Sequence, residues 1–157
     1  MALFLPLFAF AEDTLDSGNT AWMMVSTALV LLMTPAGLAL FYGGMSRSKN
    51  VLNTYAMVMG AFVVAFVVWI IAGYSIAFGT NESAMLQNVF GGFGNVMLDG
   101  IKWTDLTSVG SYPQYVFVAF QGTFAAITVA IAAGSVIGRM KYSTWMLIVV
   151  LWGLLVY

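Results

Sequence analysis

Residues 37–53 read GLALFYGGMSRSKNVLN, and they join two apolar runs through a short basic corner. The first run ends at Gly44, and Arg47 and Lys49 follow before the next run begins. A basic corner between two apolar runs is typical of the turn between two membrane-spanning helices. We expect Gly43 and Gly44 to end the first helix and to allow the tight return.

Three runs without any charged residue are long enough to cross a bilayer as helices. They cover residues 21–44, 51–78 and 114–138, and each exceeds the roughly 20 residues that a spanning helix needs. A fourth run, residues 143–157, would form a helix of about 22 Å, shorter than the roughly 30 Å hydrocarbon core. Either the sequence is part of a longer protein, or the chain is complete with a short interfacial tail.

The composition excludes an ordinary soluble domain. The chain is 62% hydrophobic and 7% charged, whereas soluble domains average about 25% charged residues. A soluble fold of this size could not cover its surface with so few polar groups. We therefore expect an all-α integral membrane protein, and the net charge of -1 argues against nucleic acid as a partner.

The residue types that are missing restrict the chemistry. The sequence has no cysteine and no histidine. Disulfides, thiol catalysis and cysteine or histidine metal sites are therefore excluded for this sequence. Since no nucleophile–base pair is present either, we expect no enzyme, no catalytic residue, no cofactor and no metal ligand.

Charge placement predicts how the chain is oriented in the membrane. Four of the five basic residues lie in two short corners, residues 45–50 and 139–142, and the fifth is Lys102. The acids lie in the N-terminal segment or in residues 79–113, and they are Glu12, Asp13, Asp16, Glu82, Asp99 and Asp105. By the positive-inside rule, both basic corners face the cytoplasm, and the N-terminus and residues 79–113 face outside.

Two weaker patterns lie outside the spans. Residues 1–11, MALFLPLFAFA, end like a signal-peptide cleavage site but lack its basic start. They are either a cleaved signal peptide or an uncleaved outer segment. In the long loop, residues 91–95 read GGFGN. Because no strand is predicted before this glycine cluster, it indicates a flexible or tightly turning loop rather than a phosphate-binding loop.

The run at residues 114–138 has two distinct helical faces. One face consists of small residues spaced four apart: Gly122, Ala126, Ala130 and Gly134. The other consists of Phe120, Phe124 and Thr128. The offset of two residues corresponds to about 200° on a helix, so the two faces point in opposite directions. Small residues let the backbone of a neighbouring helix approach closely, while the aromatic face either lines an entrance or contacts lipid.

Two segments resemble the ammonium transporter family, the Amt/Mep group that is related to Rhesus proteins. The first segment, residues 20–53, reads TAWMMVSTALVLLMTPAGLALFYGGMSRSKNVLN. The second, residues 112–143, reads YPQYVFVAFQGTFAAITVAIAAGSVIGRMKYS. The resemblance covers nearly the whole chain, in the order expected of the first four transmembrane helices.

The resemblance implies an architecture. Members have eleven transmembrane helices, arranged as two inverted five-helix halves and a final helix, and they form homotrimers. Residues 1–157 would then be an N-terminal part of one such domain, with helices at about 21–44, 51–78 and 114–138 and part of a fourth at 143–157. It also implies a bacterial or archaeal plasma membrane and a cytoplasmic regulator of the PII type.

The family's site residues are carried over to the matching positions. The resemblance implies that Phe120 and Phe124 bind ammonium at an outer aromatic vestibule. It implies that Phe41 and Tyr42 line the cytoplasmic end of the pore. We expect Thr128, on the aromatic face, to line the pore as well. The paired histidines of the family lie on later helices that this sequence does not contain.

The implied function is transport of ammonium or ammonia, with methylammonium as an analogue. A desolvated cation over an aromatic ring gains about 2 kcal/mol, whereas a bare ion in a low-dielectric pore loses tens of kcal/mol of solvation. The aromatic rings can therefore hold ammonium at the entrance, and we expect ammonia to cross an apolar pore with separate proton transfer. Two alternatives are an ammonium-sensing input domain of a signalling protein and a non-transporting accessory membrane subunit.

Overall fold

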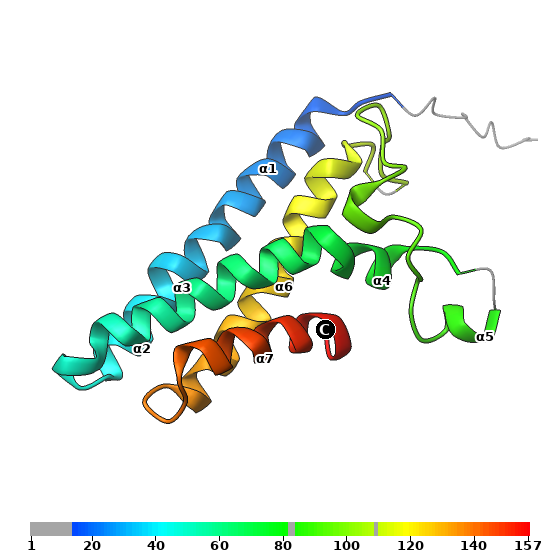
Figure 1. The fold of residues 1–157 in the computed structure, drawn as a ribbon. Coiled ribbons are helices and arrows are strands. Elements are labelled where there is room, and N and C mark those ends of the chain that lie inside the picture. Colours follow the sequence, from blue (N-terminus) through cyan, green and yellow to red (C-terminus); the bar gives the residue numbers. More distant parts are fainter. Residues whose placement is uncertain (1–13, 82–83, 109) are drawn as a thin grey trace, which may run out of the picture.

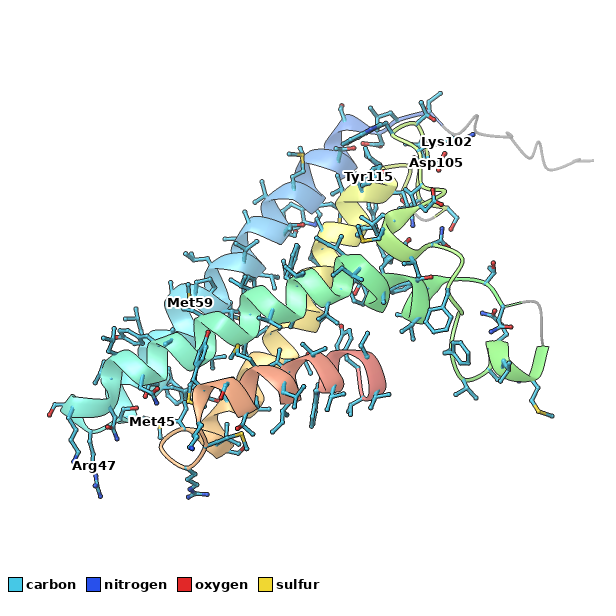
Figure 2. All side chains as sticks on the ribbon, viewed as in Figure 1. Met45, Arg47, Met59, Lys102, Asp105 and Tyr115 are labelled. Atoms are coloured by element: carbon cyan, nitrogen blue, oxygen red, sulfur yellow. The ribbon has the colours of Figure 1, made fainter. Side chains whose placement is uncertain are left out.

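The computed structural model describes residues 14–81, 84–108 and 110–157. The signal-peptide interpretation of residues 1–11 lies outside these ranges. Within them the helices run back and forth between two ends of the molecule (Figure 1). Figure 2 shows Arg47 at one end, which we call the basic end, and Lys102 and Asp105 at the other, which we call the acidic end.

The first long helix runs from the acidic end to the basic end. It consists of three consecutive elements: α1 (Ser17–Leu32), the π-helical η1 (Met33–Leu38) and α2 (Ala39–Met45). The Asp16 side chain caps its start by accepting a hydrogen bond from the Asn19 backbone N–H at 2.8 Å. Pro35 lacks an N–H group and lies in η1. The wider π-helical turn accommodates this missing donor, so the helix continues past the proline.

The end of this helix differs from the prediction. Gly43 and Gly44 do not end it, because α2 continues to Met45. Gly43 instead faces the Tyr55 ring on the following helix, where a Cβ atom would lie 2.9 Å from Tyr55 Cζ. The glycine is therefore required by side-chain packing between the two helices and not by the turn.

The rest of the chain forms a second long helix that returns to the acidic end, a loop at that end, and two further helices. The second long helix consists of the 3-10 turn η2 (Ser48–Asn50), α3 (Val51–Val68), the π-helical η3 (Trp69–Gly73) and α4 (Tyr74–Phe78). The loop at the acidic end contains two short pieces, α5 (Ala84–Gln87) and η4 (Val96–Leu98). Two helices follow, α6 (Gln114–Val136) and α7 (Tyr142–Leu155).

Three of these helical runs have the length and apolar composition needed to cross a membrane. They are Ser17–Met45, Ser48–Phe78 and Gln114–Val136, with 29, 31 and 23 residues. At 1.5 Å per residue, even the shortest run measures about 34 Å, which exceeds the roughly 30 Å hydrocarbon core. The fourth helix, α7, is also apolar but has only 14 residues.

The loop at the acidic end is tied to the helix that precedes it. The buried Ser75 hydroxyl donates to Gly92 O at 3.0 Å and accepts from Asn95 N at 2.9 Å. The backbones of Gly79 and Gly91 touch, since a Cβ atom on Gly91 would lie 2.6 Å from Gly79 N. The glycine cluster therefore serves close backbone packing, as a tight turn requires.

The core lies where α3, α6 and α7 meet. Figure 1 shows α6 crossing between α1 and α3, with α7 beside α3 and the basic-end part of α6. The small-residue face of α6 points into this core, and Gly122, Ala126 and Ala130 are buried. The prediction that this face packs against its neighbours is confirmed.

What packs against Gly122 differs from the prediction. A Cβ atom on Gly122 would lie 2.7 Å from Trp69 Cδ1 and 2.9 Å from Phe66 Cε2. The Trp69 indole also donates a hydrogen bond to Val118 O at 3.1 Å. The glycine therefore makes room for aromatic side chains of the second long helix, rather than for its backbone.

We predict that Gly122→Ala lowers the stability of the protein. The added methyl group must displace the Trp69 ring, and overpacking of this kind costs about 1–3 kcal/mol. The midpoint of thermal unfolding in detergent should fall. The matched control is Gly44→Ala in α2, where an added Cβ atom meets no atom within 4 Å, and an equal loss in both variants would contradict the prediction.

We predict that Ser75→Ala loosens the loop at the acidic end. The change leaves Asn95 N–H and Gly92 O without their shared partner, at a cost of about 1–3 kcal/mol. Amide hydrogen exchange at Asn95 should become faster. Thr27→Ala, which removes only a bond within one helix, is the control, and unchanged exchange at Asn95 would refute the role of Ser75.

Candidate functional site

An aromatic pair lies on the part of α6 near the acidic end. The rings of Phe120 and Phe124 meet edge to face, with centroids 5.0 Å apart and an interplanar angle of 76°. Their spacing of four residues places them one above the other on the same face of the helix. Both rings are half-buried, so they remain accessible beside the packed core.

The same face continues toward the basic end as an exposed strip. Thr128 and Ile131 follow Phe124 and are exposed, whereas Gly122, Ala126 and Ala130 of the small-residue face are buried and Gly134 at its end is exposed. The Thr128 hydroxyl donates to Phe124 O at 2.7 Å. Its hydrogen is therefore already used within the helix, and its oxygen remains available as an acceptor.

Tyr42 reaches α6 from α2 near the basic end. Its hydroxyl donates to Ile131 O at 2.8 Å, and its ring lies over Gly134, where a Cβ atom would be 2.7 Å from Tyr42 Cζ. Phe41 has a different position: its side chain is 62% exposed, and its ring contacts the Tyr42 ring at 5.7 Å. Of the two neighbours, only Tyr42 is held against α6 by a hydrogen bond.

A cavity of about 460 Å³ opens beside Tyr42 at the basic end. Its lining includes Ser46, Asn50 and two arginines, Arg47 and Arg139. The acids of the described residues, Asp16, Asp99 and Asp105, lie in the segment before α1 or in the loop before α6. The electrostatic potential at this cavity is therefore set by positive groups.

The structure brings four of the five predicted site residues to one helix. Phe120, Phe124 and Thr128 belong to the exposed side of α6, and Tyr42 is bonded to Ile131, about 10 Å beyond Phe124 along the helix axis. Phe41 is next to Tyr42, but its side chain is exposed and has no hydrogen-bonding group that could attach it to α6. Among the described residues, no group of three His, Cys, Asp or Glu side chains could hold a metal ion.

Of the two residues that fix this arrangement, Trp69 was not singled out by sequence reasoning, whereas Gly134 was named there only as part of the small-residue face of α6. Trp69 and Gly134 hold α6 at its two ends, through the contact with Gly122 and the contact with Tyr42. A tryptophan inside an apolar run and glycines on a helix face were visible in the sequence. Nothing in their spacing indicates which ring packs over which glycine.

Comparison with known proteins finds relatives that are named ammonium transporters. The Ammonium Transporter Family profile matches residues 21–157. An ammonium transporter of Aquifex aeolicus is 47% identical over 155 residues, which cover 96% of this chain and 34% of that protein. One from Mycobacterium bovis is 46% identical over 153 residues, which cover 90% of this chain and 32% of that protein.

A solved structure shares the fold. The crystal structure of Saccharomyces cerevisiae Mep2 superposes with a TM-score of 0.76 at 30% identity, and the match covers 92% of this chain and 31% of that one. The predicted all-α membrane fold is thereby confirmed. This chain spans about a third of the length of the curated relatives that it matches. On the sequence match and the shared fold, the chain belongs to the ammonium transporter family.

Proposed function

We propose that the protein containing this chain moves ammonium or ammonia across a membrane, with methylammonium as a transported analogue. The observation that carries the proposal is the family match over residues 21–157. Relatives at 47% and 46% identity are named ammonium transporters, which are not enzymes. The three helices of membrane-spanning length support a protein that crosses the bilayer several times.

In this proposal the acidic end faces outside, and Phe120 and Phe124 recruit the cation there. Two observations support this role. The ring pair lies on the accessible side of α6, in the half of the helix nearer the acidic end. A loop with more acids than bases also raises the local concentration of cations.

The route beyond the aromatic pair is apolar. No charged residue occurs between Gln114 and Gly138, and Thr128 can offer only an acceptor oxygen. A bare ammonium ion would lose far more hydration energy here than one hydroxyl and two rings can return. We therefore propose that ammonium gives up a proton after recruitment, to the paired histidines that the family carries on helices outside this sequence, and that ammonia passes Thr128. Phe41 and Tyr42 then line the cytoplasmic end, and proton transfer occurs separately.

The proposed assembly follows the family as well. We propose an eleven-helix subunit with inverted repeats, a homotrimer, and a plasma membrane in which the basic end faces the cytoplasm. The clustering of Arg47, Lys49, Arg139 and Lys141 in the turns of the basic end supports that orientation. A PII-type regulator would then meet the protein at this end.

We predict that Phe124→Ala in the full-length protein weakens recruitment of methylammonium. Loss of one ring removes about 0.5–2 kcal/mol of cation–π attraction, so the apparent KM for uptake should rise about 2- to 30-fold. Uptake of labelled methylammonium by cells or vesicles measures the effect.

Phe93→Ala is the matched control for this change. Phe93 is an exposed ring in the loop whose one ring contact is with Phe90, so its removal should leave uptake unchanged. Identical uptake kinetics for Phe124→Ala and the unmodified protein would remove the assigned role. A full-length protein that binds methylammonium without transporting it would favour the sensing alternative.

We predict that Gly134→Ala slows transport without weakening recruitment. The new Cβ atom would lie 2.7 Å from Tyr42 Cζ, so the Tyr42 ring must leave its position against α6. The maximal uptake rate should fall several-fold while the KM changes little, because Phe124 is about 15 Å away along the helix. Gly44→Ala serves as the control, and an unchanged rate would show that the Tyr42 position does not matter for transport.

A further inference from the structure

A second, smaller cavity lies at the acidic end, between α4, the start of α6 and the loop before it. Its volume is about 250 Å³. Four aromatic side chains line it, namely Tyr74, Phe78, Tyr112 and Phe117, together with Thr107, Ser108 and Gln114. None of these residues is charged. Phe120 and Phe124 do not line this cavity, so it is separate from the recruitment site proposed above.

The rings around this cavity form walls at different angles. Tyr74 and Phe78 are stacked, with centroids 5.6 Å apart and an interplanar angle of 28°. Phe117 meets Phe78 at 5.1 Å and 78°, nearly at a right angle. Aromatic rings that line a small cavity are the kind of side chain over which proteins bind methylated ammonium groups.

Part of the cavity wall is fixed before any ligand arrives. Tyr74 is only 4% exposed, and the Gln114 side-chain amide donates to its hydroxyl oxygen at 2.6 Å. The Gln114 backbone N–H donates to Asp105 O at 2.9 Å, which holds the loop against the first turn of α6. A prearranged wall lowers the entropy cost of binding a small ligand.

The charges near the cavity favour a cation. Asp16 N–H donates to Ser111 O at 2.9 Å, which places Asp16 beside the residue that precedes Tyr112. The backbone carbonyl of Asp105 accepts from Gln114 N–H, which places Asp105 next to a residue that lines the cavity. In the described part of this end, Lys102 is the one base against Asp16, Asp99 and Asp105. The net negative field attracts cations and disfavours anions.

We propose that this cavity is a binding site for a small alkylammonium cation, of the class that includes methylammonium and tetramethylammonium. Uncharged aromatic walls cannot replace the hydration shell of bare ammonium, but they suit a cation whose methyl groups already weaken its hydration. Phe117 is three residues before Phe120, about 4.5 Å further out along α6. The site therefore holds the cation one helical turn outside the aromatic pair, and its existence does not depend on transport.

The test is isothermal titration calorimetry. The full-length protein in detergent is titrated with tetramethylammonium chloride, and sodium chloride serves as the salt control. Phe117→Leu should weaken tetramethylammonium binding about 3-fold or more, because one aromatic wall is lost. Phe117→Tyr keeps the ring and should bind like the unmodified protein. Phe78→Leu, at a side chain that is 46% exposed, provides a second wall variant in case Phe117→Leu does not fold.

Two controls separate this site from the aromatic pair. Phe93→Leu, a loop ring that does not line the cavity, should leave binding unchanged. Phe124→Ala should change uptake kinetics while tetramethylammonium still binds. If Phe124→Ala abolishes binding and the wall variants do not, the cation lies at the aromatic pair; the cavity proposal is then overturned while the transport proposal stands. Equal binding of neutral tert-butanol would also overturn it, because the site would then recognise shape without charge.

Discussion

An aromatic ring laid over a glycine, with a donor bonded to a carbonyl of the preceding turn, joins the helices of this chain. The interaction occurs twice, as Trp69 over Gly122 with a bond to Val118 O and as Tyr42 over Gly134 with a bond to Ile131 O. At a third contact the two parts come from different side chains, since the Tyr142 ring lies over Gly60 and the Trp145 indole donates to Met57 O. Each helix carbonyl oxygen points toward the following turn and keeps a second lone pair after its bond within the helix. The N–H or O–H group of a ring that lies over a glycine can therefore donate to the carbonyl of the preceding turn. In a bilayer, where water cannot serve buried donors, such internal partners replace the missing water.

The first two of these contacts determine where the candidate site lies. Trp69 comes from the second long helix and Tyr42 from the first, and they hold α6 near opposite ends. Because both rings occupy the small-residue side of α6, the helix cannot rotate about its axis without breaking a contact. The side that carries Phe120, Phe124 and Thr128 is therefore turned away from the core. The orientation of the aromatic pair thus depends on Trp69 and Tyr42, neither of which belongs to the proposed recruitment site.

Much of this could be predicted from sequence, and the remainder has physical reasons. Charge-free runs of more than 20 residues and the placement of charges predict the helices and the two ends. Spacing of four predicts which α6 residues share a face. Sequence spacing does not say what fills the space over a glycine, so Trp69 was missed, Tyr42 was named only for the pore and not for its packing on Gly134, and Gly43 was misread as a helix end. The π-helical segment at Trp69–Gly73 also has no proline to signal it, unlike the one that contains Pro35.

Hydroxyl groups in the described spans are mostly bonded within their own helices, and this constrains the proposed route. Thr27 and Thr128 each donate to the carbonyl four residues earlier. A hydroxyl whose hydrogen is already used can accept a hydrogen bond from a passing molecule but cannot offer one. Thr34, beside Pro35, differs from these, since its buried oxygen has no partner in the part of the chain that the structure describes. Hydroxyl groups that can only accept hydrogen bonds can bind a passing ammonia molecule, which has N–H groups to donate. They cannot replace the hydration shell of an ion. In the proposed route, the cation is therefore selected at the aromatic rings, before the apolar path begins.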